Sequence, residues 1–319
     1  MNQANNTIVH NVQDVFSLDG IHQNSAFCAN DHIVLLTFDD NYLFQSINLI
    51  QSIAKYHPHG VSFLCTCPKL SEESIKVLMA LPQGIQVRCY DFALNFEMGR
   101  WALSAVLRLF CPWLLGEDIH RILYMDSDIL CTGSLQPLFD ADISCIAMCN
   151  EISGNIGKYQ NETVRPYCPT EIYCNSGVVI FNLDYLRQHH SFSEIFMALS
   201  GFNGKVYYLD QDFLNIYFRG KIHVMNAFQY NYQAYEIVGT EFYKKGLEIC
   251  RLIHFSVGKP WIYKSHPRYI RLYLKHSVYP PMIAYIKKVY LKSLLYSPVR
   301  RARRILSPFK QAWLSYKNK

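Results

Sequence analysis

The stretch from Arg121 to Leu130 limits the possible folds of this chain more than any other. An apolar run ends at two carboxylates, Asp126 and Asp128, and apolar residues resume directly after them. A run bounded in this way is typical of a buried strand that ends at the carboxyl edge of a sheet. Because open α/β sheets bind ligands at that edge, the pair predicts a functional site there.

Two carboxylates at such an edge are suited to a divalent cation. Their burial is costly unless positive charge compensates them. Mg²⁺ and Mn²⁺ prefer oxygen ligands and are often shared between a few carboxylates and the phosphates of a substrate. An acidic turn that caps the following helix would produce the same Asp-x-Asp pattern. The pair alone therefore leaves both interpretations open.

Apolar runs alternate with helical patterns along much of the chain. Strands are predicted at 32–38, 61–66, 85–90, 143–148 and 173–182, and helices at 42–56, 71–81, 100–115 and from residue 208 onward. This alternation predicts an α/β fold with a mostly parallel mixed sheet. Residues 1–30 are polar and lack periodicity, so we expect a loosely packed extension there. Polar residues 150–172 predict a loop that faces the substrate.

The composition is that of a folded protein with reduced cysteines. Half of the 319 residues are hydrophobic and 18% are charged, so we expect a sizeable core. The eleven cysteines are an odd number and lack the paired spacing of a zinc site. We found neither an apolar leader nor an apolar run long enough to span a bilayer. These features together predict buried, reduced thiols in the cytoplasm.

The charge is divided sharply along the chain. Residues 1–248 hold 25 acidic and 15 basic residues, a net charge of −10, whereas residues 249–319 hold 16 basic and no acidic ones. From about residue 280 the basic residues alternate with Tyr, Leu, Ile and Trp. This mixture favours a helix that lies in an anionic membrane interface. Docking on the acidic main domain is the first alternative, and nucleic-acid binding, which we do not favour, is the second.

Six ordered blocks between residues 32 and 261 resemble the family 8 glycosyltransferases, in particular the bacterial lipopolysaccharide α-galactosyl- and α-glucosyltransferases. The blocks are TFDDNY at 37–42, AVLRL at 105–109, YMDSD at 124–128, NSGVVIFN at 175–182, DQDFLN at 210–215 and HFSVGKPW at 254–261. Asp-x-Asp alone is a weak signal, but six blocks in order are specific. The resemblance implies a GT-A-type nucleotide-sugar-binding domain at 31–262, between the extension at 1–30 and a basic amphipathic helical segment at 263–319.

The resemblance implies a retaining hexosyltransferase that forms an α linkage. UDP-galactose or UDP-glucose would be the donor, and the acceptor would be an oligosaccharide or lipid-linked saccharide of the lipopolysaccharide core or another envelope glycan. Mn²⁺ or Mg²⁺ would be the cofactor, and the enzyme would be peripheral on the inner face of the cytoplasmic membrane. Two alternatives are a non-catalytic membrane scaffold with the same fold and a haloacid-dehalogenase-like phosphatase. In such phosphatases the Asp pair closes the first strand, whereas here it lies deep in the chain.

The family pattern also implies roles for single residues. The metal ligands would be Asp126, Asp128 and His254. The nucleotide-binding residues would be Thr37, Asp39, Asn41, Arg108, Gly258 and Lys259. Asp39 and Asn41 also suit a plain turn, and Arg108 either pairs with a carboxylate such as Asp126 or reaches donor oxygens. Relative to His254, Gly258 comes one place later and Lys259 one place earlier than in the family pattern.

The residues implied to contact the transferred sugar are Glu151, Asn175, Asp210 and Gln211. Glu151 stands where relatives often have an aspartate. Gln211 would lie near the anomeric carbon and, with Asp210, would be catalytic. A glutamine amide is a poor nucleophile, whereas double displacement requires a good one. The pattern therefore favours front-face attack by the acceptor hydroxyl. Asp212 is interpreted as a helix N-terminal acid without a catalytic part.

Overall fold

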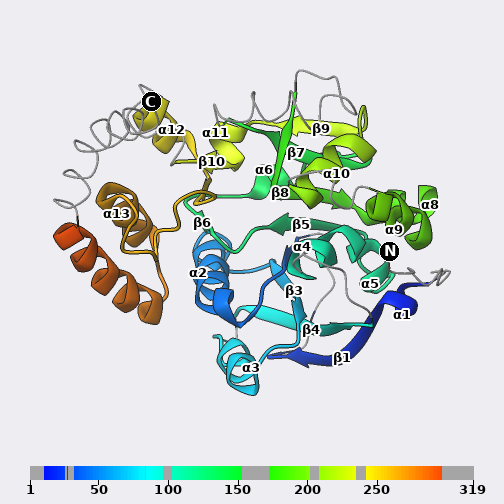
Figure 1. Cartoon of the computed structure of the whole chain (residues 1–319), viewed down its shortest axis with the longest axis horizontal. Coiled ribbons are helices and arrows are strands. Elements are labelled where there is room, and N and C mark those ends of the chain that lie inside the picture. The colour runs from blue at the N-terminus through cyan, green and yellow to red at the C-terminus, as the bar shows by residue number, and fades with distance from the viewer. Residues whose placement is uncertain are drawn as a thin grey trace, which may run out of the picture.

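An eight-stranded mixed sheet forms the centre of the molecule (Figure 1). The computed structural model describes residues 11–25, 27, 32–82, 84–95, 103–152, 172–201, 208–234 and 242–296. The strand order is β1-β4-β3-β2-β5-β8-β7-β9. Four neighbouring pairs are parallel and three are antiparallel. The prediction of an α/β fold with a mostly parallel mixed sheet is confirmed.

The strands of this sheet are β1 (Phe16–Gln23), β2 (Ile33–Leu36), β3 (Ser62–Pro68), β4 (Gln86–Leu94), β5 (Arg121–Met125), β7 (Ile146–Asn150), β8 (Cys174–Asn182) and β9 (Ile222–Met225). A second sheet contains β10 (Tyr232–Gln233), β11 (Leu252–His254) and β6 (Ile129–Cys131). The helices are α1 (Val12–Val15), η1 (Asp40–Tyr42), α2 (Leu43–Ala54), α3 (Glu72–Met79), α4 (Leu103–Leu107), η2 (Arg108–Phe110), α5 (Cys111–Leu114), α6 (Gln136–Phe139), α8 (Leu183–His189), α9 (Phe192–Gly201), α10 (Leu209–Tyr217), α11 (Ala227–Tyr230), α12 (Phe242–Ile249) and α13 (Pro267–His276). A further helix covers residues 280–296.

The central strands are buried on both faces, which explains their continuous apolar runs. Side chains along a strand point alternately to the two faces of a sheet. In β2, Val34 and Leu36 join the core that contains the buried side of α2. Ile33 and Leu35 join a second core on the opposite face, which contains residues of α9 and α10. The strong strand signals in the sequence therefore mark the middle of the sheet.

Residues 11–23 differ from the loose extension that we predicted for residues 1–30. They form α1 and β1, and β1 pairs antiparallel with β4 along its length. Val15 and Phe16 are buried, and the Phe16 ring lies 5.5 Å from that of Phe110, centroid to centroid. Because β1 is an edge strand, it is held largely by backbone pairing, and most of its side chains are partly or fully exposed. An edge strand of this kind has few apolar residues, so the sequence pattern did not predict it.

The helix predicted at 100–115 is confirmed only in part. Residues 100–102 lie outside the described ranges, and the rest is divided into α4, the 3₁₀ turn η2 and α5. Pro112 stands in the first turn of α5. A proline has no backbone N–H, so the carbonyl of Arg108 receives no α-helical hydrogen bond from Pro112, and the regular helix is interrupted by the 3₁₀ turn before it. Arg108 opens the 3₁₀ turn.

The chain after β11 docks on the second sheet through α13 and the helix at 280–296. Met282 and Ile286 of this helix are buried in one core with Leu130 of β6 and Tyr273 of α13. The alternative of intramolecular docking is therefore confirmed for this part of the segment. Its membrane contact stays a prediction, as does the separate status of residues 263–319. Residues 297–319 lie outside the described ranges.

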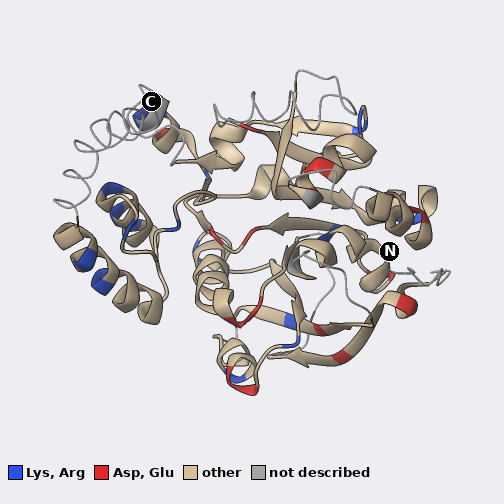
Figure 2. Cartoon of the chain, in the orientation of Figure 1, with Lys and Arg blue, Asp and Glu red and all other residues tan. Residues whose placement is uncertain are grey.

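The opposite face of the helix at 280–296 is exposed and basic. Lys287, Lys288 and Lys292 are exposed, and Leu291 and Leu295 expose 62% and 80% of their surface. Figure 2 shows the blue lysines and arginines on this helix and on α13. In the described part of the chain, we found no helix that combines the length and the apolar content needed to cross a bilayer. The nine cysteines described are all buried free thiols, as we expected.

Candidate active site

The Asp-x-Asp pair lies at the carboxyl edge of the main sheet, directly after β5. The backbone N–H of Asp126 donates to the carbonyl oxygen of Gly177, at 2.8 Å. The chain then enters β6, whose antiparallel pairing with β11 places His254 opposite Ile129. This pairing brings His254 beside two carboxylates that precede it by more than a hundred residues. The prediction of a strand that ends at the pair is confirmed.

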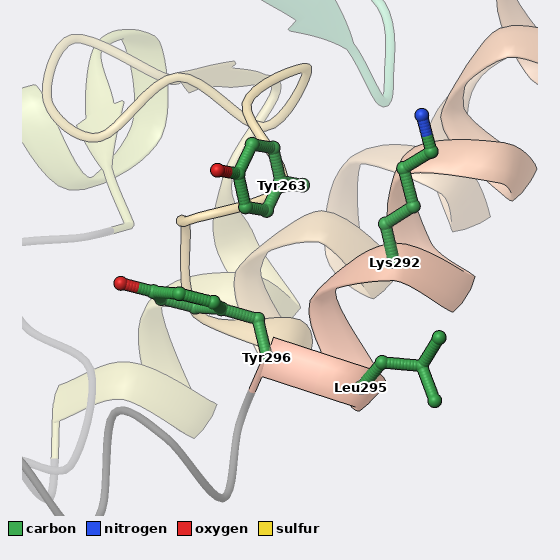
Figure 3. Close-up of a pocket in the computed structure, with 4 residues that line it drawn as sticks. All are labelled: Tyr263, Lys292, Leu295 and Tyr296. Carbon is green, nitrogen blue, oxygen red and sulfur yellow. The ribbon is translucent and has the colours of Figure 1, made fainter.

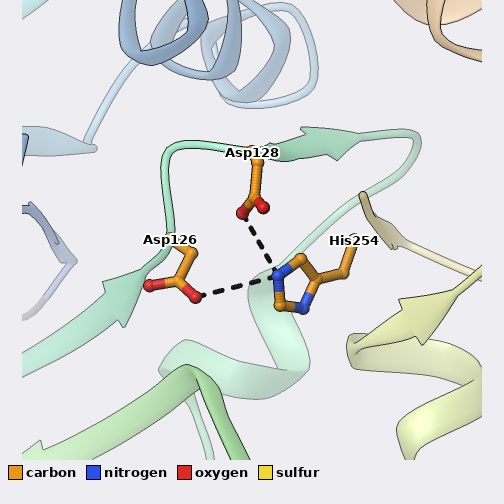
Figure 4. A group of neighbouring side chains, drawn as sticks. All are labelled: Asp126, Asp128 and His254. Atoms are coloured by element: carbon orange, nitrogen blue, oxygen red, sulfur yellow. Dashed lines mark ion pairs between the residues drawn. The ribbon is translucent and has the colours of Figure 1, made fainter. Parts of the chain in front are cut away.

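Asp126, Asp128 and His254 form a compact cluster (Figure 4). The Nε2 atom of His254 lies 3.1 Å from Oδ1 of Asp128 and 3.7 Å from Oδ2 of Asp126. One ligand atom from each side chain lies within 4.8 Å of the others. The side chain of Asp128 is 6% exposed and that of His254 is 3% exposed, whereas Asp126, at 25%, reaches the surface. The cluster is therefore open on one side.

The polar atoms of this cluster fit a bound cation. Oδ1 of Asp128 is buried and faces Nε2 of His254 at 3.1 Å. The other ring nitrogen of His254, Nδ1, lies 2.7 Å from Oδ1 of Asn231. The carboxylates and Nε2 therefore converge on one place, and carboxylate oxygens suit hard divalent cations. We call Asp126, Asp128 and His254 the metal corner.

The carboxylate of Asp128 stays charged although it is buried. Burial raises its pKa, but His254 and Lys259 lower it more, so the pKa lies well below its usual value. The ammonium group of Lys259 contacts Oδ2 of Asp128 directly. Burial lowers the pKa of His254, but the charges of Asp128 and Asp126 outweigh this effect and the pKa is raised. Asp128 is thus an ionised group held by neighbouring cationic side chains.

Arg108 joins the metal corner to helix α10. Its Nη1 atom lies 2.9 Å from Oδ1 of Asp126 and 3.3 Å from Oδ2 of Asp210. Burial lowers the pKa of the guanidinium, but neighbouring groups, including the two carboxylates, outweigh burial and raise it. Tyr124 lies under the guanidinium at 4.4 Å and donates its hydroxyl hydrogen to Asp126, at 2.7 Å. Of the two alternatives for Arg108, the structure contains the ion pair, while contact with donor oxygens stays a prediction.

The residues predicted to contact the sugar come together from three elements. The Nδ2 group of Asn175 in β8 donates to Glu151, at 2.9 Å, and to Oε1 of Gln211 in α10, at 3.0 Å. The hydroxyl of Ser176 donates to Oδ2 of Asp210, at 2.9 Å. Asp210 and Gln211 lie in the first turn of α10. These four predicted residues therefore form one connected patch next to the metal corner.

Three buried residues in this region received no site role from the sequence: Tyr173, Asp212 and Asn231. Asn231 contacts both His254 and Asn175, and Tyr173 donates to Asp212. Asp212 does lie in the first turn of α10, but it is fully buried and also accepts the backbone N–H of Tyr208, at 2.9 Å. Its interpretation as a simple helix N-terminal acid is therefore incomplete. Asn231 stands in no motif, so the sequence offered no signal for it.

The first-strand block lies at the carboxyl end of β2. Asp39 accepts a hydrogen bond from the backbone N–H of Asn41, at 3.0 Å, and another from its side chain, at 3.2 Å. These bonds are the turn chemistry that the sequence also allowed. The hydroxyl of Thr37 lies 3.1 Å from that of Thr66. Nucleotide contacts of Thr37, Asp39 and Asn41 stay predictions.

The loop after His254 reaches both the metal corner and the first-strand block. Gly258 has φ +63°, a left-handed backbone conformation that glycine adopts most readily. The chain turns there, and Lys259 reaches back to Asp128. Two residues further on, the ring of Trp261 packs edge-to-face against Tyr42, with 5.8 Å between the centroids. The shifted spacing of this loop thus places Lys259 at the metal corner.

Comparisons with known proteins agree with this arrangement. The sequence profile of the family described as "Glycosyl transferase family 8" matches residues 33–265. The lipopolysaccharide 1,2-glucosyltransferase of Escherichia coli K12 is 25% identical over 278 residues, 80% of each chain. Glycosyltransferase GlyF of Streptococcus pneumoniae is 25% identical over 72% of this chain, which spans 56% of the length of GlyF. The crystal structure of galactosyltransferase LgtC with donor and acceptor sugar analogs has a TM-score of 0.61 at 22% identity and covers 78% of this chain and 97% of LgtC. The fold is of the GT-A type.

Proposed function

This chain belongs to glycosyltransferase family 8, and we propose that it is a metal-dependent, retaining transferase of galactose or glucose from a UDP-sugar. The acceptor is a saccharide, either the lipopolysaccharide core or another envelope glycan. The similarity to a lipopolysaccharide 1,2-glucosyltransferase supports an envelope acceptor. The observation that carries the proposal is the metal corner, where Asp126, Asp128 and His254 converge at the edge of the sheet.

The metal corner would hold Mn²⁺ or Mg²⁺ through Asp126, Asp128 and Nε2 of His254. When bound, the ion would stabilise the negative charge that develops on the diphosphate as the sugar bond breaks. The convergence of Oδ1 of Asp128, Oδ2 of Asp126 and Nε2 of His254 supports this role. Arg108 pairs with both Asp126 and Asp210, and so fixes the position of a metal ligand relative to a sugar ligand.

The nucleotide would lie along the carboxyl ends of β2 and β5. Thr37, Asp39 and Asn41 would contact uracil and ribose, because they follow β2 at the carboxyl edge of the sheet. The neighbouring Tyr42, which packs against Trp261 of the loop after His254, supports this proposal. Lys259 is a compact positive charge suited to the diphosphate. Its contact with Asp128 supports this position, because it places the ammonium group at the metal corner, where the diphosphate would bind.

The sugar would lie against Glu151, Asn175, Asp210 and Gln211. Oε1 of Gln211 accepts hydrogen bonds from Asn175 and from the backbone N–H of Ser176. Both of its lone pairs are thus engaged, which supports an orienting role and argues against a nucleophilic one. We propose front-face substitution: the acceptor oxygen bonds to the anomeric carbon on the face from which the diphosphate leaves, and the hydroxyl proton goes to that diphosphate. The product linkage is then α.

The exposed face of the helix at 280–296 would lie against an anionic membrane. Lys287, Lys288 and Lys292 supply charge, and Leu291 and Leu295 supply apolar surface. An open pocket of about 420 Å³ lies at the end of this helix, lined by Tyr263, Lys292, Leu295 and Tyr296 (Figure 3). This combination of cation and apolar surface supports a peripheral location on the inner face of the cytoplasmic membrane.

Hydrolysis and transfer assays with UDP-galactose and UDP-glucose test the proposal. We expect release of UDP from one of the two donors with Mn²⁺ present, its loss in excess chelator and its return when Mn²⁺ is restored. NMR of the transfer product should show an α linkage. Full activity in excess chelator would overturn the metal dependence, and a β linkage would overturn the retaining mechanism. Glu117→Gln, an exposed substitution away from the site, serves as the control.

A further inference from the structure

Six buried side chains connect the metal corner to helix α10 through consecutive hydrogen bonds. We call them the amide relay, and in order they are His254, Asn231, Asn175, Gln211, Tyr173 and Asp212. The first four bonds measure 2.7, 2.8, 3.0 and 3.0 Å. Each of the six residues exposes 8% of its surface or less. Water therefore contributes little to the choice of donors and acceptors inside the relay.

Backbone groups determine which way the two central amides point. The N–H of Gly177 lies 2.9 Å from Oδ1 of Asn175, and the N–H of Ser176 lies 3.1 Å from Oε1 of Gln211. A backbone N–H can only donate, so the atoms that face it must be the side-chain oxygens. The amide nitrogen of Asn175 is then the donor to Gln211. The amide nitrogen of Gln211 is likewise the donor to Tyr173.

The same reasoning extends to both ends of the relay. Because Asn175 presents its oxygen, Asn231 must present its nitrogen to Asn175 and its oxygen to Nδ1 of His254. A hydrogen bond then requires a proton on Nδ1. At the other end, the hydroxyl of Tyr173 donates to Asp212. Every donor in the relay therefore points from His254 toward Asp212.

We propose that the amide relay holds a proton on Nδ1 of His254, so that Nε2 is the ring nitrogen left for a cation between Asp126 and Asp128. Asn231 is the positioning residue in contact with the ring, and Asp212 is the far anchor. The importance of the relay for activity rests on the proposed function, because it depends on a cation at the metal corner. The Nδ1 proton itself does not depend on that function.

The chemistry of metal ligation explains why such control is useful. A histidine binds a metal through an unprotonated nitrogen, and its other nitrogen is commonly held by a hydrogen-bond acceptor. The opposite tautomer of His254 would place an N–H bond where the cation has to bind. It would also place the lone pair of Nδ1 against the oxygen of Asn231, and no amide in the relay can turn without opposing two like groups. The close approach of Gly177 holds the ring in place, since a Cβ there would lie 2.3 Å from Cε1 of His254.

Nitrogen-15 NMR of His254 tests the proposal directly. In metal-free protein we expect a proton on Nδ1 of His254 whether or not Nε2 is also protonated. Asn231→Ala should allow the form that lacks the Nδ1 proton to appear and should weaken Mn²⁺ binding about 10- to 100-fold, measured by electron paramagnetic resonance of free Mn²⁺. Asn231→Asp keeps an acceptor for the ring, so it should keep the Nδ1 proton. Asn226→Ala, which removes an exposed helix cap on α11, is the matched control and should change neither.

The possible outcomes separate the relay from the proposed function. A wild-type His254 without a proton on Nδ1 would overturn the relay, and so would an Asn231→Ala variant with unchanged Nδ1 protonation and Mn²⁺ affinity. Loss of the Nδ1 proton in Asn231→Asp would overturn it as well. If Nδ1 protonation behaves as expected but wild-type protein binds no Mn²⁺, the relay stands and the proposed function fails. Tyr173→Phe should weaken Mn²⁺ binding less than Asn231→Ala, and no change at all would overturn the role of Asp212.

Discussion

The metal corner and the amide relay share His254 but use their polar atoms in opposite ways. Within the relay each side-chain donor faces an acceptor, from Nδ1 of His254 to the carboxylate of Asp212. In the metal corner, Nε2 of the same ring faces the carboxylates of Asp128 and Asp126. One side of the imidazole thus faces an amide, and the other faces two carboxylates.

The difference follows from what each region has to do. Matched buried pairs resist rearrangement, because a turned amide would leave donors or acceptors without partners at a cost of about 1–3 kcal/mol each. The carboxylates of the metal corner concentrate negative charge, which Lys259 and Arg108 compensate in part and a bound cation would compensate further. The relay therefore provides rigidity, and the metal corner provides affinity for positive charge. A substitution can therefore disrupt the relay or the metal corner without disrupting the other.

Asp128→Asn should produce the largest effect, because it removes charge from the metal corner. We expect the transfer rate with Mn²⁺ to fall by roughly two to three orders of magnitude, as for the loss of one dedicated transition-state group. Mn²⁺ affinity should fall as well, while the Nδ1 proton of His254 should remain, since Asn231 still accepts it. A rate close to that of the wild type would contradict the role of the metal corner, and Glu117→Gln again serves as the control.

Gln211→Ala should break the relay at its centre with a somewhat smaller effect. The proposed contact with the reacting carbon matters mainly in the transition state, so we expect kcat to fall about 100-fold and the KM for the donor to change little. Steady-state kinetics over a range of UDP-sugar concentrations checks this split. A rise in KM that accounts for the whole loss of kcat/KM would instead assign Gln211 to ground-state binding.

Gly177→Ala should disturb both regions at once, through sterics alone. A Cβ would lie 2.3 Å from Cε1 of His254 and 2.9 Å from Oδ1 of Asn175. Overpacking of this kind costs about 1–3 kcal/mol, so the free energy of unfolding measured in urea should fall by that amount. Gly84→Ala is the matched control, since a Cβ there meets no atom within 4 Å. Equal stability of the two variants would mean that the ring of His254 can move aside.

The metal corner could be predicted from sequence, whereas the amide relay could not. Asp126 and Asp128 follow a strong apolar strand, and a buried carboxylate pair suggests a cation by its chemistry. His254 was found through its sequence block. Asn231 stands in no block, and its importance depends on two partners, His254 and Asn175, that are distant in sequence. The polarity of the relay depends further on backbone N–H groups, which no side-chain pattern reveals.

The elements of the fold also differ in how well the sequence predicted them. Strands β2, β3 and β5 are buried on both faces, so their apolar runs predicted them. The edge strand β1 has few buried side chains and was missed. The helix at 280–296 has a buried face and a basic face, and its sequence alone suits both docking and membrane contact. Because Met282 and Ile286 are buried in the core, one face of the helix docks on the rest of the protein. The membrane contact of the other face stays a prediction.

The smallest expected effect concerns the exposed, basic face of the helix at 280–296. Removing one lysine near an anionic surface costs about 1 kcal/mol of binding, so Lys288→Ala should lower partitioning to anionic liposomes about fivefold. Lys55→Ala, at the exposed end of α2, should leave sedimentation unchanged. Because screening weakens the attraction, the two variants should converge as salt is raised. Hydrolysis of UDP-sugar should be equal in both, since Lys288 lies away from the metal corner. Equal partitioning at low salt would show that this face does not meet the membrane, and would leave docking as the whole role of the helix.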